Sequence, residues 1–149
     1  MAYELSKKSK MSMNEDKKIY LGIDPGRCKT GLALVDALGC IVKLDIVPTE
    51  NIKDAIVTFC EGEQLTAVIL GDGTNSKNVA EKLQGVLPTL PQFFVAEAYS
   101  TEEARKLYWQ ENPPEGIKKL IPQGLLVPPI PLDAYAAVVQ VRRWLKLKK

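Results

Sequence analysis

Three short apolar segments early in the chain are joined by turns that leave room for only one arrangement of strands. The segments cover residues 19–23, 30–35 and 40–47. Residues 24–26 (Asp-Pro-Gly) and 36–39 (Asp-Ala-Leu-Gly) separate them, and Pro and Gly at these points interrupt strands and favour turns. A parallel return would require a crossover of about a dozen residues or more. The segments are therefore predicted to form three antiparallel strands.

The pattern then changes to helices that alternate with apolar runs. Apolar residues recur at helical spacing from Ile52 to Cys60, and a continuous apolar run follows at residues 66–70. A run of that kind is typical of a strand buried on both faces. The same reasoning predicts, in order, a helix capped by Ser76, a second buried strand at 93–96, a helix from Ser100 to Trp109 with a capping box, and a final helix over about 133–147.

This order of elements predicts an α/β fold of the ribonuclease-H-like kind. The two later strands are each reached through a helix and can join the first strand by right-handed crossovers. The result is a five-stranded mixed sheet, three strands antiparallel and two parallel, flanked by helices. Residues 113–131 hold six of the ten prolines and are predicted to be irregular. Residues 1–17 are polar and are predicted to be a flexible tail before a single domain at 18–149.

Composition limits the chemistry of the chain. None of the 149 residues is a histidine, which excludes Ser-His-Asp and Cys-His triads and His-ligated zinc. Three cysteines without C-x-x-C spacing are typical of free thiols in a reducing compartment. No apolar run reaches the roughly 18 residues of a membrane span, and the start of the chain lacks the apolar segment of a secretory signal. A cytoplasmic protein without membrane partners is expected.

Four carboxylates follow buried strands or open a helix: Asp24, Asp72, Glu97 and Asp133. Each has a simpler alternative role, since Asp24 and Asp72 can form turns, Glu97 can pair with a cation, and Asp133 can cap its helix. Open α/β sheets usually place their ligands at the carboxyl ends of the strands, so these side chains are expected to converge there. Carboxylate oxygens are the ligands that Mg²⁺ and Mn²⁺ prefer, and metal-assisted hydrolysis of a phosphodiester needs no histidine.

Three blocks of sequence, in this order, resemble motifs of the RuvC-type and YqgF-type nucleases. The blocks are Gly22–Gly26 with Thr30–Ala33, Glu97 with Ser100, Thr101 and Ala104, and Asp133 with Ala136 and Ala137. The resemblance implies a ribonuclease-H-like nuclease of Holliday-junction resolution or of pre-16S ribosomal RNA processing. It further implies that Asp24, Glu97 and Asp133 bind Mg²⁺ or Mn²⁺, with Asp72 as a fourth catalytic candidate.

Basic residues near these carboxylates predict contacts with a phosphate backbone. They are Arg27, Lys29, Lys77, Arg105, Arg142 and Arg143. A solvated helix face is the alternative. The expected partner is RNA or branched DNA. The apolar stretch at 125–130 indicates a docking surface or a homodimer contact, or a cover for the core.

The sequence is also compatible with two other classes of protein. Ala96 and Ala136 stand where the resembled families often carry acids, which favours a non-catalytic module that binds nucleic acid or protein. A nucleotide-binding protein of the actin and sugar-kinase type can also begin with Gly-Ile-Asp. Those proteins pair two such domains around the nucleotide, whereas this chain has the length of one.

Overall fold

The structure is a computed structural model and describes residues 18–73, 75–96, 100–122 and 125–148. The predicted tail at 1–17 lies outside the described residues. The elements, in chain order, are β1 (Ile19–Asp24), β2 (Lys29–Asp36), β3 (Ile41–Pro48), the 3-10 helix η1 (Thr49–Asn51), α2 (Ile52–Phe59), β4 (Leu65–Asp72), α3 (Ser76–Val86), β5 (Gln92–Ala96), α4 (Ser100–Glu111), the 3-10 helix η2 (Gly116–Leu120) and α5 (Asp133–Lys148).

The strands form one five-stranded sheet with the order β3-β2-β1-β4-β5. The pairs β1–β2 and β2–β3 are antiparallel, as the short turns require. The pairs β1–β4 and β4–β5 are parallel, and α2 and α3 provide the connections. The predicted mixed α/β sheet is confirmed, and it matches the ribonuclease-H-like arrangement.

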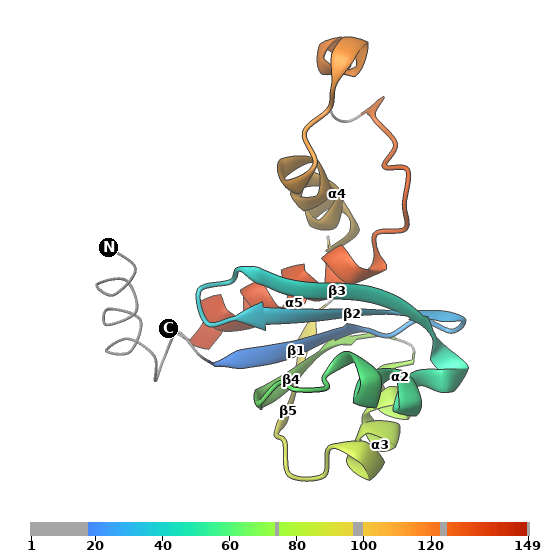
Figure 1. The fold of residues 1–149 in the computed structure, drawn as a ribbon, viewed down its shortest axis with the longest axis vertical. Coiled ribbons are helices and arrows are strands. Elements are labelled where there is room, and N and C mark those ends of the chain that lie inside the picture. The colour runs from blue at the N-terminus through green and yellow to red at the C-terminus, as the bar shows by residue number, and fades with distance from the viewer. Residues whose placement is uncertain (1–17, 74, 97–99, 123–124, 149) are drawn as a thin grey trace.

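Helices cover both faces of the sheet and bury two separate hydrophobic clusters. Successive residues of β1 alternate between them, because side chains of a strand point to opposite faces. Tyr20 packs into the cluster beneath α4 and α5, whereas Leu21 and Ile23 pack into the cluster beneath α2 and α3. Figure 1 shows the two helix pairs on opposite sides of the sheet. The apolar run of β4 is buried on both faces, as predicted.

Helix α5 lies unusually close to the sheet because glycines line its path. One glycine lies on each of the three central strands that the helix crosses: Gly22, Gly31 and Gly71. A Cβ at Gly22 would lie 2.6 Å from the carbonyl oxygen of Ala137, and a Cβ at Gly31 would collide with the backbone of Asp133. The close approach brings the first turn of α5 directly over the end of the sheet.

Two expectations about local structure are wrong. Strand β5 is not buried on both faces, since Phe93 and Phe94 are 38% and 48% exposed. The strand lies at the edge of the sheet, and an edge strand has a neighbour on one side alone. Ser76 does not cap α3, because Asn75 holds that position while the Ser76 hydroxyl donates a hydrogen bond to the carbonyl oxygen of Gly73.

The proline-rich segment is irregular apart from η2 and projects from the sheet together with α4 (Figure 1). It carries apolar side chains that are largely exposed, among them Ile117, Leu120 and Val127. A homodimer contact in this segment remains a prediction. No helix in the described part of the chain is both long enough and apolar enough to cross a membrane.

Candidate active site

Asp24 ends β1, and the turn that follows it is held in place by neighbouring elements. The carbonyl oxygen of Gly26 accepts hydrogen bonds from Thr49 Oγ1 at 2.8 Å and from Asn75 Nδ2 at 2.9 Å. The backbone N–H of Thr49 donates to the carbonyl oxygen of Cys28 at 2.9 Å. Thr49 of η1 and Asn75 at the start of α3 therefore both support the turn and fix the backbone that follows Asp24.

Gln140 of α5 contacts the carboxylate of Asp24. This side chain of α5 is fully buried, and its Nε2 donates a hydrogen bond to Asp24 Oδ1 at 3.1 Å. Its amide lies directly over Gly71, where a Cβ would collide with it. Gln140 is a site residue that the sequence analysis missed, although a signal existed: it interrupts the apolar run 136–141 (Ala-Ala-Val-Val-Gln-Val).

Asp133 joins Asp24 at the same edge of the sheet. Its backbone packs on Gly31 of β2, and Gly31 is the residue paired with Asp24 across the two strands. Both aspartates line one pocket of about 600 Å³, together with Thr101 and Arg105 of α4 and residues of the segment before α5. The structure thus brings together two of the four predicted carboxylates.

Arg105 adds a positive charge to this pocket. Its Nε is buried and has no hydrogen-bond partner in the described part of the chain. Arg105 lines the same cavity as the two aspartates. A planar guanidinium matches the geometry of a phosphate, so the pocket combines carboxylates suited to a cation with a donor suited to an anion.

Asp72 is not brought into this pocket. Along β4, Ile69 packs beneath α4 and α5, Leu70 packs beneath α2 and α3, and Gly71 lies under α5. Because strand side chains alternate, Asp72 belongs to the face of α2 and α3, and it is exposed. Gly71, rather than Asp72, is the residue of β4 that lies beside Asp24 on the face of α5, and the side chain of Gln140 covers it.

Glu97 lies outside the described residues. Of the three predicted metal ligands, the structure therefore describes two, Asp24 and Asp133. Within the described ranges, no group of three or more Cys, Asp or Glu side chains is placed to hold a metal ion. Asp24 and Asp133 still offer the right donor chemistry, since Mg²⁺ prefers carboxylate oxygens and commonly takes one or two carboxylates beside several waters. The residues present fit such an ion.

The predicted phosphate-contacting cations divide into two groups. Arg27 and Lys29 are exposed in the turn and at the strand start just after Asp24. Lys77 is exposed in the first turn of α3. It follows two residues after Asn75, which donates a hydrogen bond to Gly26 in the turn after Asp24. These three residues therefore lie near the turn after Asp24, whereas Arg105 lines the pocket itself.

Arg142 and Arg143 lie elsewhere. At 1.5 Å per residue, the nine residues from Asp133 to Arg142 place these arginines about 14 Å further along the axis of α5. There Arg142 Nε donates to the carbonyl oxygen of Gly39 at 2.8 Å, in the turn after β2. The structure therefore separates them from the pocket of Asp24.

No protein-family model matches this chain, and no curated protein sequence matches it. Among solved structures, Thermus thermophilus RuvC in complex with a Holliday junction substrate is similar at a TM-score of 0.53 and 16% identity, over 88% of this chain and 95% of that one. A second structure of T. thermophilus RuvC has a TM-score of 0.51 at 17% identity, over 87% and 96%. The fold is therefore RuvC-like.

A ROK family transcriptional regulator, a homologue of the E. coli MLC protein, is similar at a TM-score of 0.47 and 13% identity, over 64% of this chain. This chain spans 32% of that regulator and 36% of a ROK glucokinase from Streptomyces griseus. The matched region thus covers about a third of the length of these ROK proteins.

Proposed function

We propose that this chain is a metal-dependent nuclease that hydrolyses phosphodiester bonds in structured nucleic acid. The observation that carries the proposal is the shared pocket of Asp24, Asp133 and Arg105 at the carboxyl end of β1. Cation-binding and phosphate-binding groups face one cavity there, as hydrolysis of a phosphodiester requires. The RuvC-like fold supports the same reading, since one RuvC structure was solved with a Holliday junction substrate.

The proposed roles follow from the position of each side chain. Asp24 and Asp133 would hold Mg²⁺ or Mn²⁺, with Glu97 as a further ligand and Asp72 as a candidate outside the pocket. A bound divalent cation supplies positive charge to the phosphate and makes water a better nucleophile. Arg105 contacts the scissile phosphate, and Gln140 keeps the Asp24 carboxylate oriented through its 3.1 Å hydrogen bond.

The substrate is RNA or DNA with a defined three-dimensional shape. Arg27 and Lys29 lie in and just after the turn that follows Asp24, and Lys77 lies in the first turn of α3. They would contact neighbouring phosphates without reading the bases. Two substrate types fit the proposal: precursor ribosomal RNA, as for a YqgF-type nuclease, and a branched DNA junction, as for RuvC. The experiment below distinguishes them.

The test is cleavage of a labelled four-way DNA junction and of labelled pre-16S ribosomal RNA ends, with Mg²⁺, Mn²⁺ or EDTA. Asp24→Asn and Asp133→Asn should each reduce metal-dependent cleavage by about 100-fold or more, since charge stabilisation at the reacting phosphate is lost. Asp45→Asn is the matched control, because Asp45 is exposed on the edge strand β3. Undiminished cleavage by Asp24→Asn would falsify the proposal.

A second candidate function is a non-catalytic module that binds nucleic acid or protein. Ala136 favours it, because this residue lines the pocket one turn after Asp133 and adds no ligand. Metal binding separates the two candidates, since a ligand that binds the folded state raises its melting temperature. A melting temperature indifferent to Mn²⁺, together with retained binding of junction or RNA and no cleavage, would support the second candidate.

A further inference from the structure

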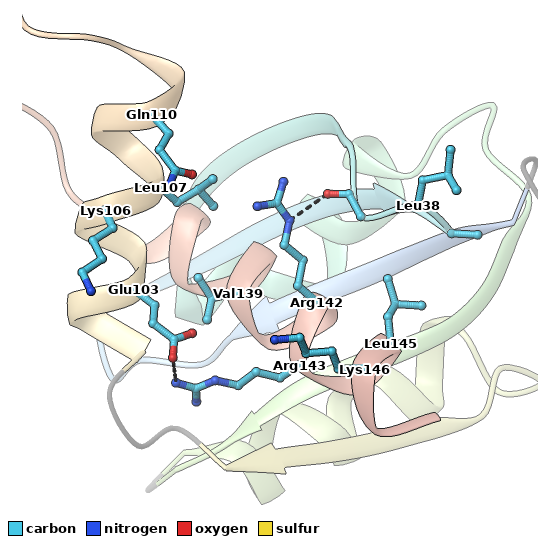
Figure 2. Close-up of a pocket in the computed structure, with 12 residues that line it drawn as sticks. Leu38, Glu103, Lys106, Leu107, Gln110, Val139, Arg142, Arg143, Leu145 and Lys146 are labelled. Carbon is cyan, nitrogen blue, oxygen red and sulfur yellow. Dashed lines mark hydrogen bonds and ion pairs between the residues drawn. The ribbon is translucent and has the colours of Figure 1, made fainter. Parts of the chain in front are cut away.

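A second pocket lies on the opposite face of α4 from the pocket of Asp24. Its volume is about 460 Å³, and it is formed by α4, the C-terminal half of α5 and the turn between β2 and β3 (Figure 2). The two pockets have no lining residue in common. Thr101 and Arg105 of α4 line the first, whereas Lys106, Leu107 and Gln110 line the second. The volume falls within the range of ligand-binding pockets, which is roughly 300–1,000 Å³.

Two arginines in this pocket are held rigidly. Arg142 Nε donates to the carbonyl oxygen of Gly39 at 2.8 Å, which ties α5 to the turn after β2. Arg143 donates to the carbonyl oxygen of Ala96 at 2.8 Å and forms an ion pair with Glu103 of α4 at 2.9 Å. Figure 2 shows Arg142 and Arg143 extending from α5, with the Arg143–Glu103 ion pair drawn as a dashed line. Preorganised cations lose little side-chain entropy when they bind an anion.

The pocket has more positive charge than its own residues neutralise. Glu103 is its one acidic lining residue and is already paired with Arg143. Arg142, Lys106 and Lys146 have no carboxylate partner among the residues that the structure describes. Lys106 and Lys146 are exposed, so their charges face solvent. An occupant of this pocket is therefore expected to be acidic.

Apolar side chains form the rest of the lining. Leu107 of α4 and Val139 of α5 are almost fully buried at its base, and Leu145 lies beside them. Leu38 in the turn after β2 is 73% exposed at the edge. An exposed leucine next to a cavity offers an apolar surface that a bound side chain can cover.

We propose that this pocket binds an acidic peptide segment of a partner protein, with one apolar side chain inserted over Leu107 and Val139. Acidic residues beside that anchor pair with Lys106, Arg142 and Lys146. A nucleic-acid strand would satisfy the cations but has no aliphatic side chain of leucine size for the base of the pocket. Bases usually stack on aromatic side chains, and none of the described lining residues is aromatic.

The test measures fluorescence anisotropy of a short labelled peptide in which Leu and Phe alternate with Asp and Glu. The peptide should bind the full chain, and the double variant Lys106→Gln/Lys146→Gln should weaken binding about three- to tenfold, because two exposed charge pairs are lost. The matched control is Lys118→Gln/Lys119→Gln, which removes the same charge from exposed positions in η2. The control should bind the peptide as the unmodified chain does.

A second peptide, with Ser in place of Leu and Phe, tests the apolar anchor and should bind at least several-fold more weakly. Equal binding of the two peptides would overturn the proposal, because the contact would then be purely electrostatic. An equal loss in the control variant would also overturn it. A third result would also overturn the proposal: an RNA or DNA duplex displaces the peptide, and the Lys106/Lys146 variant binds that duplex more weakly. The pocket would then be a phosphate-binding surface.

Discussion

At the scale of single residues, the buried amide of Gln140 is the clearest link between packing and chemistry. Its Nε2 supports Asp24, while its Oε1 is buried without a hydrogen-bond partner in the described part of the chain. A hydrogen bond to a charged group contributes about 1.5–3 kcal/mol, and an unsatisfied buried group costs about 1–3 kcal/mol. The two terms nearly cancel, so the free energy of folding gives no reason for a glutamine here.

Gln140→Leu is therefore expected to separate stability from activity. The leucine fills similar space and removes the unpaired carbonyl, so the free energy of unfolding in urea should change by less than about 1 kcal/mol. Metal-dependent cleavage should fall by about 10- to 100-fold, the usual cost of losing a group that orients a metal ligand. Gln84→Leu, at an exposed position of α3, is the control. A variant that loses stability and activity in parallel would show that Gln140 is structural.

Cys60 provides a test of the core beneath α2. Burial raises the pKa of its thiol from 9.0 to about 11, although Lys43 partly opposes the rise. Thiolate is the reactive form, so iodoacetamide at pH 8 should modify Cys60 at least about tenfold more slowly than the exposed Cys28 and Cys40. The rate at Cys60 should keep rising from pH 9 to pH 11, as the thiol ionises. Mass spectrometry of each peptide gives the rates, and all three cysteines should react alike in urea.

At the scale of elements, the closeness of α5 to the sheet depends on the glycines beneath it. Gly22→Ala should lower the free energy of unfolding by about 1–3 kcal/mol, since its Cβ would lie 2.6 Å from both the Ala137 carbonyl oxygen and a Val141 methyl group. Gly85→Ala is the opposite case. It lies within α3, where its Cβ would be 3.9 Å from Lys53 Nζ, the one close neighbour among the described residues, and alanine is the better helix former.

Urea denaturation checks both changes, and Gly85→Ala should stabilise the protein by up to about 1 kcal/mol. The gain is limited because Gly85 is near the end of α3, where helices fray. Equal effects of the two variants, in either direction, would contradict the close packing described for α5.

Most elements could be predicted from local pattern, because turn residues and apolar periodicity reflect the backbone directly. Strand β5 shows the limit. Its Phe-Phe-Val-Ala run looks like that of β4, but burial depends on which strands lie on either side, and that is set by pairing between distant segments. The face of the sheet on which Asp72 lies is likewise set by its neighbour Gly71, which lies under α5, and no local motif reveals this.

The candidate site could be predicted only in part, because local pattern shows where elements end but not how they cross. Asp24 and Asp133 each end or begin an element, so their convergence follows from topology alone. The separation of Arg142 from that edge follows from the length of α5, but it needs the direction in which the helix crosses the sheet. A count of basic residues in the sequence cannot distinguish these two positions.

At the scale of the whole molecule, α4 and α5 separate two positively charged regions with different surroundings. The region around Asp24 carries Arg27, Lys29 and Lys77 beside carboxylates at one edge of the sheet. The region around Arg142 lies toward the other end of α5, over an apolar base. The net charge of +2 is thus a poor guide to binding, because its distribution over the surface decides what each region can contact.

This separation predicts how salt affects nucleic-acid binding. If Arg27 and Lys29 each contact one phosphate, Arg27→Gln/Lys29→Gln should reduce the slope of log K against log salt concentration by about 2 for duplex DNA, since each contact releases nearly one counterion. Affinity at low salt should fall for junctions and simple duplexes alike, because phosphate contacts carry no sequence information. Lys118→Gln/Lys119→Gln, with the same loss of charge in η2, should leave the slope unchanged. Titrations by anisotropy at several salt concentrations give the slopes. Equal slopes for the Arg27/Lys29 variant and the unmodified chain would mean that nucleic acid binds away from the pocket of Asp24.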